Sequence, residues 1–186
     1  MLKTLRNAFK IKDVRNRILF TFMMLIVIRI GSELPIPGVK GSVFQSWLNS
    51  KSTDGLGFFD AVTGGSFSQM SVFALNITPY ITSSIIMQLL TIAIPKLEEL
   101  QRDGEEGRKK IVEITRYLTI ALALIEAIAM VVGFYRSNYL TDKTPLVVIM
   151  VVTSLTAGSA VLMWIGERIT EKGVGNGISI VLTINI

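Results

Sequence analysis

Cysteine and histidine are both absent from this chain of 186 residues. Without them the chain has no disulfides, no thiolate nucleophile and no imidazole base, and it lacks the usual ligands of zinc and haem. It also lacks the glycine-rich phosphate loop, ending in Lys and Ser or Thr, on which many ATPases depend. Most catalytic arrangements are therefore excluded, and we expect neither an enzyme nor a bound metal or cofactor.

Apolar residues make up 50% of the chain and fall in long blocks, and the mean hydropathy is +0.54. Because a helix needs about 20 apolar residues to cross a bilayer, these blocks predict an all-α, polytopic membrane helix bundle. The expected spans are 18–34, 72–94, 111–135 and 146–165. A fifth apolar run, 178–186, is too short to cross a bilayer, so we expect the chain to be a fragment of a longer protein.

The basic residues predict the orientation of these spans. Fourteen of the 19 Lys and Arg lie in or beside the segments 1–17, 95–110 and 166–177. Cytoplasmic flanks hold the excess of basic residues, so the N-terminus is predicted inside and residues 35–71 outside. No small-residue cleavage site follows the first block, which predicts a retained span. Topology and attraction to anionic lipid account for the net charge of +5, and we expect no specific nucleic acid recognition.

The external segment 57–71 is rich in glycine and serine, whose helix propensity is poor by up to about 1 kcal/mol each. It predicts a short, marginal helix. Weakly helical backbone is tolerated at membrane depth only where protein buries it or where it lines a watery cavity. Two interpretations stay open, an ordinary external loop and a movable stopper that dips into an aqueous pore.

The second apolar block contains the string "NITPY", with Pro79 about two turns into the expected span. A proline in a helix interior removes a hydrogen bond at a cost of about 3 kcal/mol, which predicts a kink. Ile77 and Ile81 lie four residues apart, on one helical face and beside polar side chains. Such a pair is either ordinary core or part of a narrow aliphatic constriction that holds back water and ions by dewetting.

Three further features are less specific. The charged segment 95–110 predicts a solvated hairpin, with a cytosolic partner as an additional possibility. The string "GVGNG" (173–177) does not follow a strand, as a dinucleotide-binding loop would, so it predicts a sharp turn back into the membrane. Glu126 falls in the middle of the third span, where a carboxylate is expected to face protein or water. A protonated, hydrogen-bonded side chain or one at a helix interface remains open.

Several long strings occur in order along the chain: "RIGSELPIPG", "FALNITPYITSSIIMQLL", "GEEGRKKI" followed by "TRY", and "MWIGERITEKGVGNGISI". In these strings, and over essentially its whole length, the sequence resembles the SecY family of protein-conducting channels. The resemblance implies a ten-helix, pseudo-symmetric translocon channel with an hourglass pore and a lateral gate. The chain corresponds to the N-terminal half, spans 1 to 5 with the fifth truncated.

The resemblance also implies site residues. The pore ring corresponds to Ile77, Ile81, Ile178 and Leu182, and Leu182 departs mildly from the isoleucine that the family favours. Asn76 stands where the family often has glycine. The plug, a short helix in the external funnel, corresponds to Gly57, Phe58, Phe59, Asp60, Ala61, Val62, Thr63, Gly64, Gly65, Ser66, Phe67, Ser68 and Gln69.

The implied function is secretion of unfolded preproteins across the bacterial plasma membrane and insertion of membrane proteins into it. Spans two and three match one side of the lateral gate. The implied partners are SecE, SecG, the SecA motor ATPase, the ribosome, signal peptides, preproteins and membrane lipid. No cofactor is implied.

Two other classes of membrane protein compete with this interpretation. A small-solute transporter also uses broken helices near the membrane midplane, but it needs a polar coordinating site where this sequence predicts an aliphatic one. An intramembrane protease needs an aspartate pair or a serine with a base. The expected spans contain no Asp, Lys or His, which disfavours this class.

Overall fold

The structure, a computed structural model, describes residues 11–50, 60 and 63–185. Over these residues it is helical and has no strand beyond two isolated bridges, Pro35 with Ser71 and Val39 with Leu140. The helices are α2 (Lys12–Ser32), α3 (Gly41–Ser50), α5 (Thr78–Ala93), α6 (Pro95–Arg102), α7 (Gly104–Arg136), α8 (Pro145–Lys172) and α9 (Gly177–Asn185). The predicted all-α fold class is therefore confirmed.

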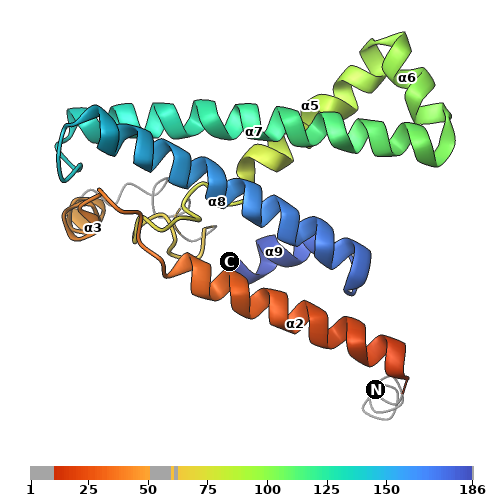
Figure 1. The fold of residues 1–186 in the computed structure, drawn as a ribbon, viewed down its shortest axis with the longest axis horizontal. Coiled ribbons are helices and arrows are strands. Elements are labelled where there is room, and N and C mark those ends of the chain that lie inside the picture. The colour runs from red at the N-terminus through yellow and green to blue at the C-terminus, as the bar shows by residue number, and fades with distance from the viewer. Residues whose placement is uncertain (1–10, 51–59, 61–62, 186) are drawn as a thin grey trace.

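Helix α8 lies at the centre of the arrangement. It runs beside the long helix α7, and it also contacts α2 and α9, which lie on its other side (Figure 1). Helices α5 and α6 extend away from α8 and form a triangle with the first half of α7 (Figure 1). Helix α8 therefore lies between α7 on one side and α2 and α9 on the other.

In the described part of the chain, two helices, α7 and α8, are long and apolar enough to cross a membrane. If the bent pair of α5 and α6 is taken together as one span, the number of candidate spans rises to three. Helices α7 and α8 correspond to the predicted spans 111–135 and 146–165. Helix α2 covers most of the predicted span 18–34, but it carries Arg15, Arg17 and Arg29. It is not among the helices that are apolar enough to cross a membrane.

The second predicted span is shorter than expected. Its helix α5 begins at Thr78, and the chain from Val72 to Ile77 forms turns, with Asn76 in the left-handed region at a φ of 53°. Pro79 therefore lies in the first turn of α5, where its missing N–H costs no intrahelical bond. The predicted kink at Pro79 is wrong; the sharp bend, of 102°, lies between α5 and α6.

Buried side chains form two hydrophobic clusters that divide α8 along its length. The first, here called the aromatic cluster, joins α3, residues 67–75, α7 and the first half of α8. The ring of Phe44 meets those of Phe67, Phe134 and Tyr139 edge to face at 5.2, 5.7 and 5.6 Å between centroids. Since each such pair contributes about 0.5–1.5 kcal/mol beyond its buried area, Phe44 anchors α3 to the bundle.

The second, here called the aliphatic cluster, joins α2, the start of α5, the second half of α8 and α9. Its buried members are Ile28, Phe73, Ile77, Leu162, Ile165, Ile169 and Val181. It contains the residues for which the sequence predicts a constriction, so it is the part of the fold that positions the candidate site.

Candidate functional site

The four predicted pore-ring residues lie in the aliphatic cluster. Ile77 is 1% exposed, whereas Ile81, Ile178 and Leu182 are half-buried and pack against the cluster. In the described part of the chain Ile77 is therefore a core residue. The other three are partly exposed at the edge of the cluster.

Ile77 and Ile178 come from different helix starts and meet at α8. A Cβ atom placed on Gly166 would lie 3.6 Å from Cδ1 of Ile77 and 3.4 Å from Cγ1 of Ile178. Both side chains therefore cover the same short stretch of the α8 backbone. Ile77 and Ile178, which are 101 positions apart in the sequence, can lie over the same point of α8 because Gly166 has no side chain there.

The backbone around Ile77 preserves the spacing that the sequence predicts. Ile77 is the residue before α5, and its carbonyl accepts hydrogen bonds from the N–H groups of Tyr80 and Ile81, both at 3.1 Å. The bond from Ile81 is the ordinary i to i−4 bond of a helix. Ile77 and Ile81 are thus one helical turn apart, although Ile77 itself lies outside the helix.

The start of α9 is held by side chains from its own loop and from α2. The Asn176 side-chain oxygen accepts hydrogen bonds from the N–H groups of Ile178 at 3.1 Å and Ser179 at 3.4 Å, which caps the helix. The predicted turn is present, with Gly175 at a φ of 75°. On α2, Thr21 Oγ1 accepts a hydrogen bond from the Val174 N–H at 3.2 Å.

Of the predicted plug, only Asp60 and Thr63–Gln69 are described; Gly57, Phe58, Phe59, Ala61 and Val62 lie outside the described residues. Thr63–Gln69 forms successive turns, so the expected short helix is wrong for this stretch. Gly64 and Gly65 have φ values of 62° and 80°, which a right-handed helix does not accommodate.

Asp60 organises these turns. Its carboxylate accepts a hydrogen bond from the Ser68 N–H at 2.8 Å, and its carbonyl accepts one from the Gly65 N–H at 3.0 Å and one from the Thr63 hydroxyl at 3.0 Å. Thr63 and Ser66 are buried. The turns then continue into a pairing with the segment that follows α2, in which the Ile36 N–H donates to the Met70 carbonyl at 2.9 Å.

Glu126 is half-buried on α7 and lines a groove of about 580 Å³ between α7, α3 and the start of α5. Other lining residues are Leu75 and Thr78, next to the candidate constriction, and Phe44 and Met130. Glu126 therefore faces a protein-lined groove while part of its surface stays exposed, which agrees with the prediction that its carboxylate faces protein or water.

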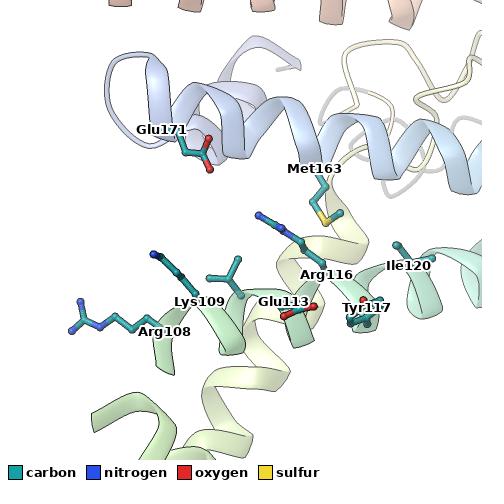
Figure 2. A pocket seen from close by; sticks show the side chains of 9 residues that line it. Arg108, Lys109, Glu113, Arg116, Tyr117, Ile120, Met163 and Glu171 are labelled. Carbon is teal, nitrogen blue, oxygen red and sulfur yellow. The ribbon is translucent and has the colours of Figure 1, made fainter. Parts of the chain in front are cut away.

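A second cleft, of about 710 Å³, opens between the first half of α7 and the end of α8 (Figure 2). Arg116 reaches from α7 toward α8, and its Nε donates to Glu167 Oε1 at 2.8 Å. Arg108 and Lys109 lie nearer the start of α7 and also line the cleft. The sequence reasoning missed this ion pair, although both residues occur in the strings "TRY" and "GER" that carry the resemblance.

Comparison with known proteins gives consistent matches. The family model described as SecY matches residues 71–186. The chain is 43% identical to the protein translocase subunit SecY of Bacillus subtilis and 44% identical to that of Thermotoga maritima. Each alignment covers 100% of this chain but only 43% and 45% of the relative, so the chain spans less than half of their length.

Solved structures match in fold. Sec61 in the canine ribosome-channel complex from the endoplasmic reticulum aligns with a TM-score of 0.63 over 92% of this chain and 36% of its own, at 20% identity. A second match is a SecY structure from a study of how the plug domain stabilises the closed state of the translocation channel. It aligns with a TM-score of 0.62 over 91% of this chain and 35% of its own, also at 20% identity.

Proposed function

The chain belongs to the SecY family, and on that premise we propose that it forms the N-terminal half of a channel through which unfolded preproteins are secreted and membrane proteins inserted. The observation that carries the proposal is the 43% identity to a translocase subunit over the whole of this chain. The channel works by conduction and not by covalent chemistry. SecA or the ribosome supplies the energy, and SecE and SecG complete the assembly.

In this proposal α5 and α7 form one side of the lateral gate. Their contact includes a buried hydrogen bond of 2.5 Å between the hydroxyls of Ser83 and Thr119. Both residues are at most 1% exposed, so water does not compete for this bond. The bond supports movement of the two helices as one unit, which a signal peptide would displace on its way to lipid.

The aliphatic cluster supplies this half of the pore ring. Ile81, Ile178 and Leu182 are half-buried and face outward, while Ile77 supports them from within. Branched aliphatic side chains offer water no hydrogen bonds, so a narrow neck lined by them dewets and resists ion flow. An unfolded polypeptide passes by pushing these side chains apart.

Asp60 and the turns of residues 63–69 form part of the plug in this proposal. Several hydrogen bonds within the segment hold it together, which supports its displacement as a compact unit rather than by unravelling. Linking this segment to the pore-facing side of α5 should stop translocation, and cleaving the link should restore it. Transport at full rate with the link intact would contradict the role of a stopper.

The proposed setting is the bacterial plasma membrane with the N-terminus in the cytosol. Because the chain has no native cysteine, single cysteines report the topology directly. Cysteines in place of Asp103 or Lys172 should react with a membrane-impermeant reagent only from the cytosol, and one in place of Asp142 only from outside. Reaction of position 103 from outside in intact cells would reverse the orientation.

The decisive experiment compares two cargoes in vesicles that contain the full-length channel with these residues. A preprotein should enter in the presence of SecA and ATP, whereas the same preprotein without its signal peptide should not. Small solutes should remain excluded at rest. Steady solute uptake without preprotein transport would favour the small-solute transporter and overturn the proposal.

A further inference from the structure

One hydroxyl group bridges α8 and α9 beside the aliphatic cluster. The Gly177 N–H, at the first residue of α9, donates to Thr170 Oγ1 at 2.9 Å. The Thr170 hydroxyl in turn donates to the carbonyl of Gly166 at 3.0 Å, one helical turn earlier in α8. Thr170 therefore uses both its donor and its acceptor to tie the start of α9 to the backbone of α8.

Helices α8 and α9 also contact each other directly through their backbones, with no side chain between them. A Cβ atom on Gly177 would lie 1.9 Å from the Gly166 carbonyl oxygen and 2.8 Å from the Ile169 Cβ. No side chain fits at that distance, and the obstacle is rigid helical backbone. The crossing of α8 and α9 is therefore as close as it is only because position 177 is glycine.

The position of Ile178 depends on this crossing. Ile178 follows Gly177 directly, and its Cγ1 lies beside Gly166 together with Cδ1 of Ile77. If α9 moved away from α8, Ile178 would leave this contact point while Ile77, which is held by α5 and α8, would stay. A gap would then open in the proposed constriction, between Ile77 at the start of α5 and Ile178 at the start of α9.

We propose that Thr170 and Gly177 are positioning residues for the constriction: they hold Ile178 beside Ile77 over Gly166. This inference rests on the proposed function for its consequence, a tight seal. The geometric part, the distance between Ile77 and Ile178, does not depend on the proposed function. The two parts can therefore be tested separately.

The geometric test uses a cysteine pair at positions 77 and 178 of a full-length channel in which any cysteine outside these 186 residues is replaced by serine, treated with a short bifunctional thiol reagent. Thr170→Val keeps the shape of the side chain and removes the bridge, whereas Thr170→Ser keeps the hydroxyl. Cross-linking should be several-fold slower in Thr170→Val than in the parent, and Thr170→Ser should retain the parent rate. Equal rates in all three proteins would overturn the inference.

The functional test measures resting ion conductance of the same channels, with native Ile77 and Ile178, in planar bilayers. Thr170→Val and Gly177→Ala should raise the conductance several-fold, because either change moves α9 outward. Gly133→Ala is the matched control, since a Cβ atom there meets nothing within 4 Å. Slower cross-linking with unchanged conductance would overturn the positioning role in the seal.

Outcomes for folding and for the proposed function remain distinguishable. If Gly177→Ala does not fold, Thr170→Val and Thr170→Ser decide the question, because neither adds an atom to the crossing. If the parent channel transports no preprotein, the proposed function fails. In that case a slower cross-link in Thr170→Val would still support the geometric part alone.

Discussion

The aromatic and aliphatic clusters share helix α8 but differ in the side chains that fill them. The aromatic cluster is organised by Phe44, whose ring meets three others edge to face. The aliphatic cluster has Phe73 as its single buried aromatic residue among those described, and several of its branched side chains are half-exposed. Edge-to-face pairing favours particular ring orientations, whereas the burial of aliphatic side chains is non-directional. This difference agrees with the proposal that the first region anchors α3 and the second supplies a seal.

The largest expected effect is loss of the anchor. Phe44→Ala should lower the free energy of unfolding by about 3–5 kcal/mol, because a ring that is 3% exposed and meets three others is removed. The measurement is the folded fraction of the full-length protein in detergent as temperature rises. Phe22→Ala on α2, where the ring is 61% exposed, is the control and should change little. If both variants lost the same free energy of unfolding, Phe44 would be no more important for stability than an exposed residue.

The next effect separates two neighbours in the aliphatic cluster. Ile77→Ser should lower folded yield, since it forfeits buried apolar surface that contributes roughly 1.5–3 kcal/mol. Ile81→Ser, at a half-buried position, should give near-normal yield but a raised resting conductance, because a hydroxyl stabilises water in the neck. Yield and conductance are measured on the same preparations. Normal yield for Ile77→Ser would show that Ile77 is not core.

A smaller effect is expected in the plug turns, which contact the aromatic cluster through Phe67. Asp60→Asn should weaken the bond from the Ser68 N–H by about 0.5–1.5 kcal/mol, because a carboxylate acceptor becomes a neutral amide. Amide hydrogen exchange over residues 63–69 should become faster. The control is Gln69→Ala, an exposed change in the same turns. Unchanged exchange in Asp60→Asn would show that the carboxylate does not organise the segment.

The smallest effect concerns the ion pair that bridges α7 and α8. Arg116→Gln should cost only about 0.2–1 kcal/mol, since the Arg116 side chain is 45% exposed and that of Glu167 is 14% exposed. The thermal midpoint should fall slightly at low salt, and the difference should shrink at high salt. Arg168→Gln is the control, because Arg168 pairs with Glu171 on the same helix. A double-mutant cycle with Glu167→Gln that gives no coupling energy would contradict the bridge.

Features that depend on long, uninterrupted patterns could be predicted from the sequence. The apolar runs near 111–135 and 146–165 are long enough that no alternative to a helix competes, and α7 and α8 cover them. The start of α5 could not be predicted in the same way. Pro79 is compatible with a kink and with a first turn, and the choice depends on distant contacts. One is at Gly158, where a Cβ atom would lie 2.0 Å from the Val72 carbonyl oxygen.

By itself, the sequence determined the all-α membrane class, the two longest helices and the pairing of Ile77 with Ile81 on one helical face. These properties follow from composition and from spacing along one chain, which local propensity and transfer to lipid set directly. Only the tertiary structure decided that Ile77 is buried while Ile81 is half-exposed, and that Ile77 and Ile178 both lie over Gly166. Whether a side chain is buried depends on which distant parts of the chain pack against it. Here glycines allow two backbones to come into contact, and that role can be seen only in the folded structure.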